Sequence, residues 1–570
     1  MKIAVVGSGT SGLGATWLLN EHSKHEVHLF EADSRPGGHA NTVRYRNPLG
    51  DDYINVDTGF IVFNTVTYPN FLAFLLETGV PYLSSDMSFS VSRDRGLFEW
   101  AGASPAALFA QPLNLLNPSH WRMAWDILRF NVGALEVLQR GDRGESIGDY
   151  LARERYSQTF IDNYLLPMTA AIWSTPPDKA ALDFPALTLI RFMYNHHLMQ
   201  ILDRPTWLTV KNGSHSYVNR ILERLDPAKY HQGHRIESVR TGGKGRKVVL
   251  KDSEGNETDW DHVIFACHAD TTLKILEKGE GITEEERRIL GGFEFSKNRA
   301  VLHSDPELMP KRRIAWSAWN YLTASDGPKL NVNSVAFFCP LPTRTYWMNL
   351  LQSIPEAIYG PVLVTLNPPF EPRKEHKFAE WDYDHPLFSE KVRALRQAFH
   401  LSDTHDIDRD FLGSGPVQSV RSQDELKKIQ NKRGITFAGA WTKYGFHEDG
   451  FASGLRIAVD HLGAQSPFPI RHAERDLNLS RTDRYLNYTF SRIDSLARIF
   501  SFPATVFLFV LMIGLSVTRM VITVLGARSI AAVIGDVIMM LQRSNGASTA
   551  PVVKLNGLKR AGAGVRDKVG

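Results

Sequence analysis

Three ionisable side chains in a row are the first feature of this 570-residue chain that could do chemistry. The stretch GFHEDGFASGL, residues 445–455, contains His447, Glu448 and Asp449 between two glycines. Consecutive residues point in different directions on a helix or a strand, whereas a zinc-type site needs convergent ligands at wider spacing. We therefore expect no metal site here. The residues that follow Asp449 fit a helix, which predicts Asp449 as its N-cap.

The opening stretch, KIAVVGSGTSGLGATWLLNE, has the residue types of a phosphate-binding turn. Lys2–Val6 is predicted to be a short buried strand, and a helix is predicted from Ser11 to Asn20. Three glycines between them follow the pattern GxGxxG, at Gly7, Gly9 and Gly12. Such a turn places a pyrophosphate at a helix N-terminus, where N–H groups and the helix dipole favour anions. The next strand ends at Glu31, whose carboxylate suits an adenosine ribose.

The residues after Glu31 indicate which dinucleotide the glycine turn would bind. ADSRPGGHANT (32–42) and VDTGFIVFN (56–64) resemble consecutive segments of the flavin amine oxidase superfamily, which includes monoamine oxidases, protoporphyrinogen oxidases and carotenoid desaturases. Many members have Arg after the glycine pair, and this chain has His39. The resemblance implies FAD as the cofactor. The residues expected to bind it are Gly7, Gly9, Ser11, Gly12, Glu31, Arg35, Gly38, His39, Asp57, Gly59, Gly439, Glu448, Asp449 and Gly450.

Members of this superfamily return to the flavin through a late strand, a turn and a final helix. ITFAGAW (435–441) fits that strand, and the stretch from Asp449 onward fits the helix. The resemblance places the helix N-terminus beneath the flavin, where its dipole would stabilise the negative charge of reduced flavin. Trp441, Tyr444 and Phe446 precede the helix, and both a pocket wall and ordinary core packing are open for them. The candidate catalytic residues are Tyr444, Phe446 and His447.

Stretches in the middle of the chain narrow the resemblance further. YNHHLMQ, RPTWLTVKNGSHSYV, TYWMNLLQ and FAGAWTKYGFHEDG are together similar to a group of predicted FAD-dependent oxidoreductases found beside, or fused to, cyclopropane fatty acid synthases. The similarity covers residues 1–465. It implies removal of hydride from a C–H bond of a lipid-like, fatty-acyl substrate, with a fatty-acid-modifying methyltransferase as a partner. The alternatives are amine oxidation and a non-catalytic flavoprotein scaffold for lipid-modifying enzymes.

The superfamily also implies the architecture, an α/β fold with a discontinuous, Rossmann-like FAD-binding domain. That domain is expected to comprise residues 1–85, 205–295 and 405–465, and an interleaved α+β substrate domain is expected to comprise residues 86–204 and 296–404. RKVVLKDSEGNETDWDHVIFACHA predicts a hairpin that leads into a further strand. HWRMAWDILRFNVGALEVL has its apolar residues at helical spacing, so the first insertion is predicted to be largely helical.

The last hundred residues differ in composition from the rest. A polar linker, residues 466–498, precedes a hydrophobic segment, residues 499–541, in which 17 consecutive residues from Phe502 to Thr518 carry no charge. That length is close to the shortest helix that spans a bilayer. We expect this segment to hold the protein on a membrane, as one span, a hairpin or an interfacial helix; a buried core helix is the alternative. The basic tail, residues 542–570, is predicted to be disordered.

Composition excludes several classes of protein. A formal net charge of +4 is too small to indicate nucleic-acid binding. Two cysteines without a CxxC motif argue against a disulfide framework or a thiolate metal site, and favour a reducing compartment. The opening residues lead into a strand, so we expect no signal peptide. Together these features predict a membrane-associated protein whose catalytic body lies in the cytosol.

Overall fold

The structure is a computed structural model. It describes residues 1–473 except 49, 142–143, 174–181, 183, 201–203, 242–246, 324–342 and 388–425, together with residues 488, 489 and 492. The chain divides into two compact units, residues 1–115 with 122–490, and residues 116–121 with 491–570. All the described sheets lie in the first unit.

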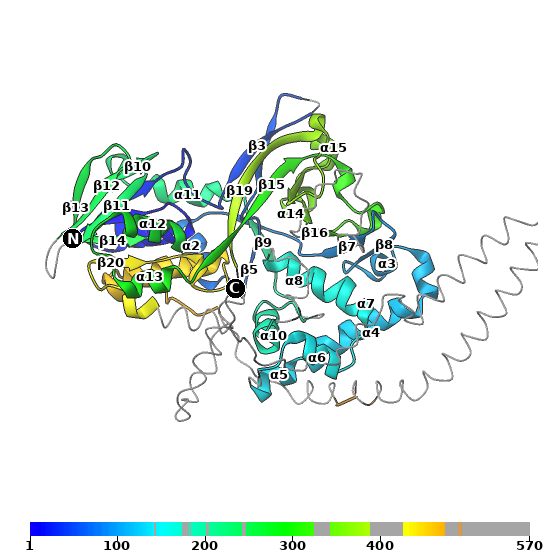
Figure 1. Ribbon diagram of the computed structural model, residues 1–570. Coiled ribbons are helices and arrows are strands. Elements are labelled where there is room, and N and C mark those ends of the chain that lie inside the picture. The colour runs from blue at the N-terminus through cyan, green and yellow to red at the C-terminus, as the bar shows by residue number, and fades with distance from the viewer. Residues whose placement is uncertain are drawn as a thin grey trace, which may run out of the picture. The chain divides into compact units, whose positions relative to one another are not determined.

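A parallel sheet forms the centre of one part of this unit (Figure 1). Its five strands, in spatial order, are β10 (Tyr230–Gln232), β2 (Glu26–Glu31), β1 (Lys2–Val6), β14 (His262–Phe265) and β20 (Ile435–Phe437). The strands predicted at Lys2–Val6 and up to Glu31 are thus confirmed. β1 and β14 are aliphatic and almost wholly buried, as expected for parallel strands covered on both faces.

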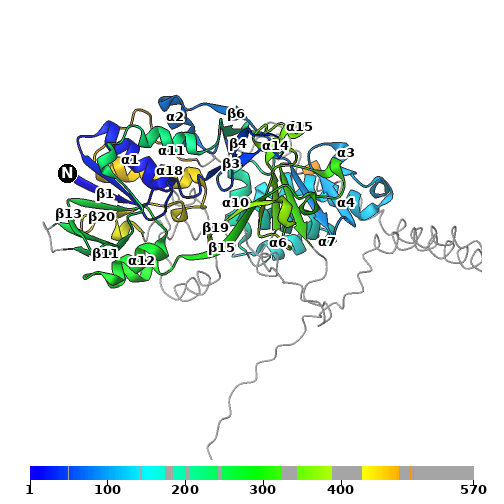
Figure 2. The ribbon, with the colours of Figure 1, turned by 90° about the horizontal axis from the view of Figure 1, so that it is seen from above.

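Helices cover this sheet, and two of them are central to the site. The helix predicted from Ser11 is confirmed as α1, Thr10–His22, and it packs along α18, His447–Arg456. Figure 2 shows both beside α11, while α12 lies against β11. The remaining helices of this part are α2 (Pro69–Thr78), α11 (His215–Leu222), α12 (Ala269–Lys278), α13 (Glu284–Leu290) and the π-turn η9 (Ile457–His461). The apolar faces of α1, α2, α11, α18 and η9 pack on one face of the sheet. Those of α12 and α13 pack on the opposite face.

Three smaller sheets complete this part. The hairpin predicted from the sequence is confirmed as β12 and β13, and it leads directly into β14. The strands of the smaller sheets are β11 (Ile236–Thr241), β12 (Val248–Asp252) and β13 (Glu257–Trp260); β3 (Thr42–Arg46) and β4 (Tyr53–Asp57); and β5 (Phe63–Asn64), β9 (Trp207–Val210) and β6 (Tyr82–Ser84).

A seven-stranded sheet dominates the other part of the unit. Its strands, in spatial order, are β19 (Lys377–Leu387), β15 (Glu294–His303), β18 (Leu363–Leu366), β17 (Thr343–Trp347), β16 (Trp319–Thr323), β7 (Phe89–Arg93) and β8 (Phe98–Ala101). Neighbouring strands are antiparallel except β16 and β7. Short helical segments accompany it: η5 (Arg313–Ala315), α14 (Met348–Leu351) and α15 (Glu356–Tyr359).

The insertion after β8 is helical, as its apolar spacing predicts. Its segments are α3 (Pro105–Leu108), η1 (Pro112–Leu116), α4 (Pro118–Gly133), α5 (Leu135–Arg140), α6 (Ile147–Arg153), α7 (Gln158–Phe160), the π-turn η2 (Ile161–Leu165), α8 (Leu166–Trp173) and α10 (Ala186–Asn195). Aromatic and aliphatic side chains of these helices form a second core cluster.

The predicted domain boundaries remain predictions, but the two main sheets separate along the chain as they would require. Every strand of the parallel sheet lies in residues 1–85, 205–295 or 405–465, and the seven-stranded sheet takes its strands from the intervening residues, except that β15 starts at Glu294. The predicted membrane segment, 499–541, and the tail, 542–570, lie outside the described residues. Within the described part of the chain, no helix has the length and apolar character needed to cross a bilayer.

Candidate functional site

The glycine turn between β1 and α1 leaves room for a ligand in one place and none in two others. Gly7 has a φ of +107°, and a Cβ there would press on the backbone of Ala266. A Cβ on Gly12 would collide with the carbonyl oxygen of Gly7. A Cβ on Gly9, by contrast, would meet no atom within 4 Å. The turn is thus closed from behind and open in front of Gly9, at the N-terminus of α1, where a pyrophosphate is favoured.

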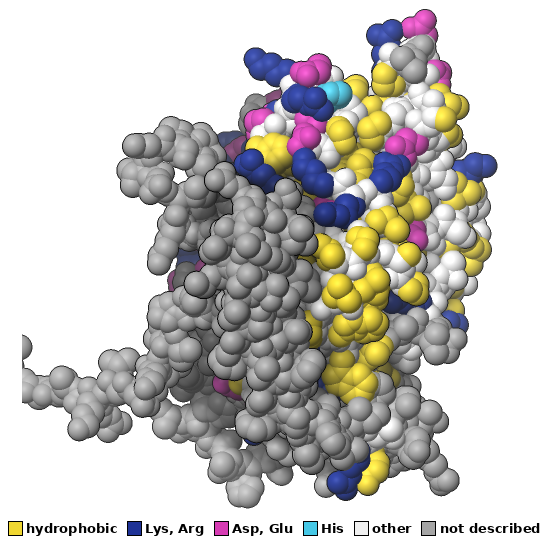
Figure 3. All heavy atoms as spheres, turned by 90° about the vertical axis from the view of Figure 1, so that its right-hand side faces the viewer, with side chains coloured by type: hydrophobic (Ala, Val, Ile, Leu, Met, Phe, Trp, Pro, Cys, Tyr) yellow, Lys and Arg dark blue, Asp and Glu magenta, His cyan; other side chains and the backbone are white. Residues whose placement is uncertain are grey.

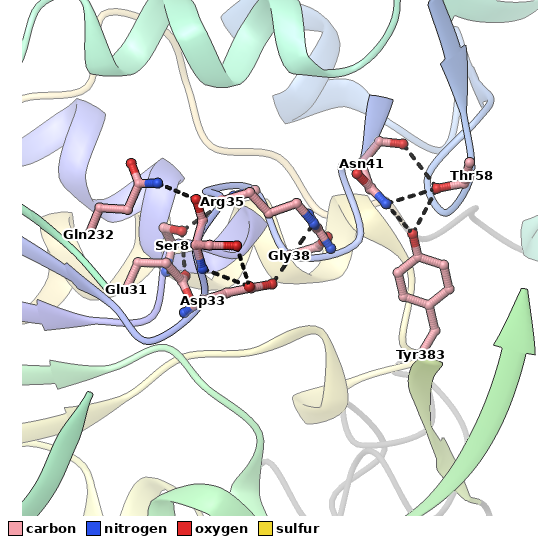
Figure 4. A network of polar contacts seen from close by, with 11 residues as sticks. Ser8, Glu31, Asp33, Arg35, Gly38, Asn41, Thr58, Gln232 and Tyr383 are labelled. Atoms are coloured by element: carbon pink, nitrogen blue, oxygen red, sulfur yellow. Dashed lines mark hydrogen bonds and ion pairs between the residues drawn. The ribbon is translucent and has the colours of Figure 1, made fainter. Parts of the chain in front are cut away.

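Glu31, at the end of β2, is fixed by the same turn (Figure 4). Its Oε2 accepts hydrogen bonds from the backbone N–H of Ser8, at 2.9 Å, and from the Ser8 hydroxyl, and its Oε1 accepts from the N–H of Asp33 at 2.8 Å. Arg35 donates to the carbonyl of Gly38 at 2.8 Å, which closes the following loop. Ser8, which the sequence did not single out, therefore orients the carboxylate predicted to hold the ribose.

The final helix begins three residues earlier than predicted. α18 starts at His447 with Phe446 in the N-cap position, so the prediction of Asp449 as N-cap is wrong. Asp449 instead accepts the Phe446 N–H at 3.0 Å from the third position of the helix, because its side chain reaches back over the first turn. A Cβ on Gly450 would lie 2.5 Å from Thr10 Cγ2, so this glycine lets α18 approach the N-terminus of α1.

Glu448 faces away from that meeting point and fastens α2 to α18. Its Oε1 accepts from the N–H and side-chain amide of Asn70, at 3.1 and 2.6 Å, and its Oε2 accepts from the N–H of Phe71 at 3.0 Å. The carboxylate is buried, and burial raises the pKa of Glu448 to about 8. With both oxygens engaged by donors of α2, Glu448 supports the start of α18. Its contact with the cofactor stays a prediction.

Asp57 has a similar supporting position. Its carboxylate accepts hydrogen bonds from the Ser214 N–H and hydroxyl, the Thr42 hydroxyl and the Gln352 amide. Burial raises the pKa of Asp57 to about 6. Gly59, two residues on, packs its Cα against the carbonyl of His39, where any Cβ would collide. Asp57 and Gly59 therefore shape the loop that carries His39.

His39 brings together residues that the sequence did not connect. Its ring stacks on Tyr383 and His385 of β19, at centroid distances of 4.9 and 5.7 Å, and lies 6.3 Å from the ring of His268. The Tyr383 hydroxyl is hydrogen-bonded to Thr58 and Asn41 (Figure 4). The buried Nε2 of His39 has no hydrogen-bond partner in the described part of the chain. Burial lowers the pKa of His39 to about 3, so the imidazole is neutral.

His447 is enclosed by aromatic rings at the start of α18. It stacks on Phe60 with ring centroids 3.6 Å apart and meets Phe71 and Tyr217 edge to face. Its buried Nε2 also has no partner. Burial holds the pKa of His447 well below its ordinary value, so the ring is neutral and can only exchange a proton if a bound molecule supplies or accepts one.

The aromatic residues before α18 separate into two groups. Tyr444 and Phe446 lie against Phe192 of α10 and against His196, which follows that helix, with ring centroids between 4.8 and 5.6 Å apart. Trp441 instead packs in the core of the parallel sheet and donates to the Cys267 carbonyl at 3.1 Å. Gly439 is required there because a Cβ would collide with the Trp441 indole. Tyr444 and Phe446 thus join the aromatic core of the helical insertion, and these residues with Phe192 and His196 are called the aromatic wall below. Trp441 belongs to the core of the parallel sheet.

The residues present fit the cofactor that the sequence resemblance implies. The open space at Gly9, the carboxylate at the end of β2 and the neighbouring N-termini of α1 and α18 are arranged as a dinucleotide needs them. Two buried imidazole nitrogens, on His39 and His447, have hydrogen-bonding capacity that no described residue uses. The described residues contain no group of His, Cys, Asp and Glu that could hold a metal ion.

Comparison with known proteins agrees with this geometry. Residues 10–291 match the family model described as flavin containing amine oxidoreductase. No curated protein sequence matches the chain.

Three solved structures share the fold, each with a TM-score of 0.50. A CLA-producing fatty acid isomerase from P. acnes is 12% identical, with 80% of this chain and 98% of that chain covered. Cyclohexylamine oxidase from Brevibacterium oxydans IH-35A is 14% identical, with 80% and 98% covered. Reduced UDP-galactopyranose mutase is 16% identical, with 81% and 94% covered. At such identities the likeness shows the fold alone.

Proposed function

Because this chain is an FAD-dependent oxidoreductase related to the flavin-containing amine oxidases, we propose that it removes hydride from a C–H bond of a lipid-like, fatty-acyl substrate. The observation that carries the proposal is the aromatic wall of Tyr444, Phe446, Phe192 and His196 beside the helix that begins at His447. Burial lowers the pKa of His196 to about 4, so the imidazole in this wall is neutral. An uncharged, aromatic surface suits an acyl chain and excludes water.

The role of the protein residues follows from their positions. When bound, FAD supplies the hydride acceptor. Tyr444 and Phe446 hold the substrate against it, and the dipole of α18 stabilises negative charge that develops nearby. His447 is the candidate proton carrier, since its Nε2 is unpartnered and its ring is clamped by Phe60. One of the solved structures that share the fold is a fatty acid isomerase, which is consistent with an acyl substrate in such a site.

Amine oxidation is the second candidate function. Aromatic ring faces can also hold a cationic amine through cation–π attraction, and one structure with the same fold is cyclohexylamine oxidase. The two candidates differ in which compounds reduce the flavin.

Anaerobic mixing of purified holoprotein with long-chain fatty acids, lipid extract or amines distinguishes them. We expect the oxidised-flavin absorbance to bleach with the fatty acids or the lipid extract and to persist with amines. Phe446→Ala should slow bleaching at unchanged flavin content, whereas Phe370→Ala, at an exposed phenylalanine elsewhere, should not. Bleaching by amines alone would contradict a fatty-acyl substrate and support amine oxidation. A flavin that neither class reduces would refute hydride removal from both.

We also propose that residues 499–541 attach the enzyme to a membrane, and that a fatty-acid-modifying methyltransferase acts on the same lipids. The apolar composition of that segment supports the first point. Cells that express the full chain, or a chain truncated at Ser491, can be fractionated to test it. The full chain should sediment with membranes and the truncated chain should stay in the supernatant with its flavin. A truncated chain that still sediments would disprove the role of this segment.

A further inference from the structure

An exposed apolar face surrounds the hairpin of β7 and β8. None of the residues assigned to the flavin site belongs to it. Four aliphatic side chains stand out in it: Leu97, Leu113, Ile314 and Ile358 are 75, 69, 52 and 47% exposed. Basic side chains lie among them in the sequence, at Arg95, Lys311 and Arg313. Figure 3 views this side of the molecule and shows hydrophobic and basic side chains intermingled on it. These seven residues are called the apolar–basic face below.

The face is built on a rigid support. The buried carboxylate of Glu99 accepts hydrogen bonds from the backbone N–H groups of Lys311 and Arg312, at 2.6 and 3.0 Å. The Gln111 side chain accepts the Glu99 N–H and donates to the Leu97 carbonyl, both at 2.9 Å. These bonds join the hairpin tip, the segment that leads to Leu113 and the segment that leads to Ile314. The aliphatic side chains are therefore displayed from fixed backbone and not from loose loops.

The hairpin turn fixes which side chains lie at its tip. Asp94 and Arg95 have φ values of +54° and +53°, in the left-handed region that non-glycine residues seldom adopt, and Gly96 follows at +91°. Positive φ values at consecutive residues are what a tight hairpin turn requires, because this backbone follows the twist of the flanking strands. Here they lead to an exposed Arg95 and an exposed Leu97 at the tip.

The opposite border of the face combines arginine with tryptophan. The Arg313 guanidinium lies over the rings of Trp316 and Trp347, at 3.9 and 4.5 Å from their centroids, and the two indoles meet edge to face at 5.6 Å. Both indoles are partly exposed. Arg313 also pairs with Glu356 of α15, the helix that carries Ile358. Tryptophan and arginine in this arrangement are typical of the boundary between hydrocarbon and headgroups.

We propose that the apolar–basic face lies on the surface of a lipid bilayer that contains anionic lipids. The aliphatic side chains project from a turn and from short helices, an arrangement that suits insertion among lipid chains better than a groove for a peptide. Lys311 and Arg313 are paired with Glu307 and Glu356, whereas Arg95 has no ion-pair partner among the described residues, so the face carries a net positive charge. This favours anionic headgroups. Lipid binding by this face requires neither hydride removal by the flavin site nor membrane attachment by residues 499–541.

Site-specific labelling of the full chain tests the proposal. Cys267 and Cys339 are first replaced by serine, and an environment-sensitive fluorophore is attached at Leu97→Cys or, as a control, at Leu76→Cys, an aliphatic position of α2 that is 63% exposed. Vesicles of phosphatidylcholine with phosphatidylserine, with and without spin-labelled lipids, are then added. We expect the label at position 97 to shift to the blue and to be quenched by the spin-labelled lipids, and the label at position 76 to do neither.

Two further results decide against the proposal. Both labels could remain in water while the protein sediments with the vesicles, which would assign binding to another part of the chain. The label at position 97 could instead be shielded without vesicles, which would indicate a protein neighbour. In a chain with Leu113→Ser and Ile314→Ser, quenching at position 97 should fall by at least half, whereas Val66→Ser with Leu83→Ser should leave it unchanged; equal quenching in both would overturn the proposal. Unchanged flavin content shows that each variant is folded.

Discussion

The two main sheets of this protein differ in how many polar side chains they bury. The parallel sheet is aliphatic inside, and Ile3, Val5 and Ile264 are completely buried there. The seven-stranded sheet buries polar residues that bond across its strands: the Ser90 hydroxyl to Asn320 at 2.8 Å, Thr345 to Thr365 at 2.8 Å, Thr365 to His303 at 2.6 Å and Asn367 to Asn298 at 2.8 Å. The first sheet depends on close packing, and the second depends on satisfied hydrogen bonds in addition to an apolar core.

The difference shows how each part tolerates change. Around the parallel sheet, the critical distances are between backbones, at glycines where a Cβ would collide. In the seven-stranded sheet, removal of one side chain leaves a buried partner without its hydrogen bond, which costs about 1–3 kcal/mol. A substitution that makes a Cβ collide with backbone should therefore prevent the first part from folding. Loss of one hydrogen bond should only lower the free energy of unfolding of the second part.

The largest effect is expected from Gly12→Val. Its Cβ would collide with the carbonyl oxygen of Gly7, and neither backbone can move without opening the turn. Little folded protein should be recovered. Gly9→Val is the matched control, because the added side chain would enter open space. That variant should fold, with a circular dichroism spectrum like the wild type, but should contain no flavin since the valine occupies the pyrophosphate position. A yellow Gly9→Val protein would contradict the assignment.

A smaller effect is expected from Asp57→Asn. The substitution replaces one acceptor oxygen by an NH2 group that can only donate, so the donors on Ser214 and Gln352 lose their acceptor. This loosens a link between the glycine-rich part and the segment that follows α14. The free energy of unfolding should fall by about 3 kcal/mol. Asp51→Asn, at an exposed carboxylate, should change it by less than about 0.5 kcal/mol. Urea unfolding measures both values, and equal losses would show that the buried network is not what stabilises this link.

In the seven-stranded sheet, the buried His303 should make the free energy of unfolding depend on pH. Its Nδ1 accepts the Asp305 N–H at 3.0 Å, so the ring must be neutral, and burial lowers the pKa of His303 from 6.5 to about 4. A depressed pKa contributes stability that is present above pH 6.5 and is lost as the pH falls toward 4. The loss approaches about 1.4 kcal/mol per pH unit for this residue.

His303→Asn isolates that contribution. The asparagine can still accept the Asp305 N–H but cannot reach Thr365, so the variant should be about 1–2 kcal/mol less stable at pH 7. Between pH 6.5 and 4 its stability should fall less steeply than that of the wild type. Parallel slopes in urea unfolding would show that the wild-type imidazole becomes protonated in the folded protein.

The smallest effect is expected on the surface of the β11–β13 sheet. Arg240 pairs with Glu257 at 3.2 Å, and both side chains are about half exposed. Solvent and salt screen such pairs, so Arg240→Ala should change the free energy of unfolding by less than about 0.5 kcal/mol. A larger loss would mean that this sheet depends on side-chain pairs as the seven-stranded sheet does.

The sequence predicted the glycine-rich part well and the seven-stranded sheet poorly, for a physical reason. β1, α1 and the hairpin of β12 and β13 are specified locally, by apolar runs and turn residues. β16, with the sequence WNYLT, and β17, with TRTYW, carry buried polar residues that resemble those of an exposed edge. Their burial is possible only because partners distant in sequence complete each hydrogen bond, and no local pattern records those partners.

The sequence by itself also determined the dinucleotide turn, since GxGxxG after a buried strand leaves few alternatives. It further indicated that the residues around α18 belong to the same cofactor site. Only the tertiary structure decided what each of those residues does. Glu448 and Asp57 are supports, Trp441 is a core residue, and His39 lies beside Tyr383 and His385 from more than three hundred residues away. Residue type fixes what a side chain can do, but which groups it meets depends on long-range packing of the strands and helices that carry it.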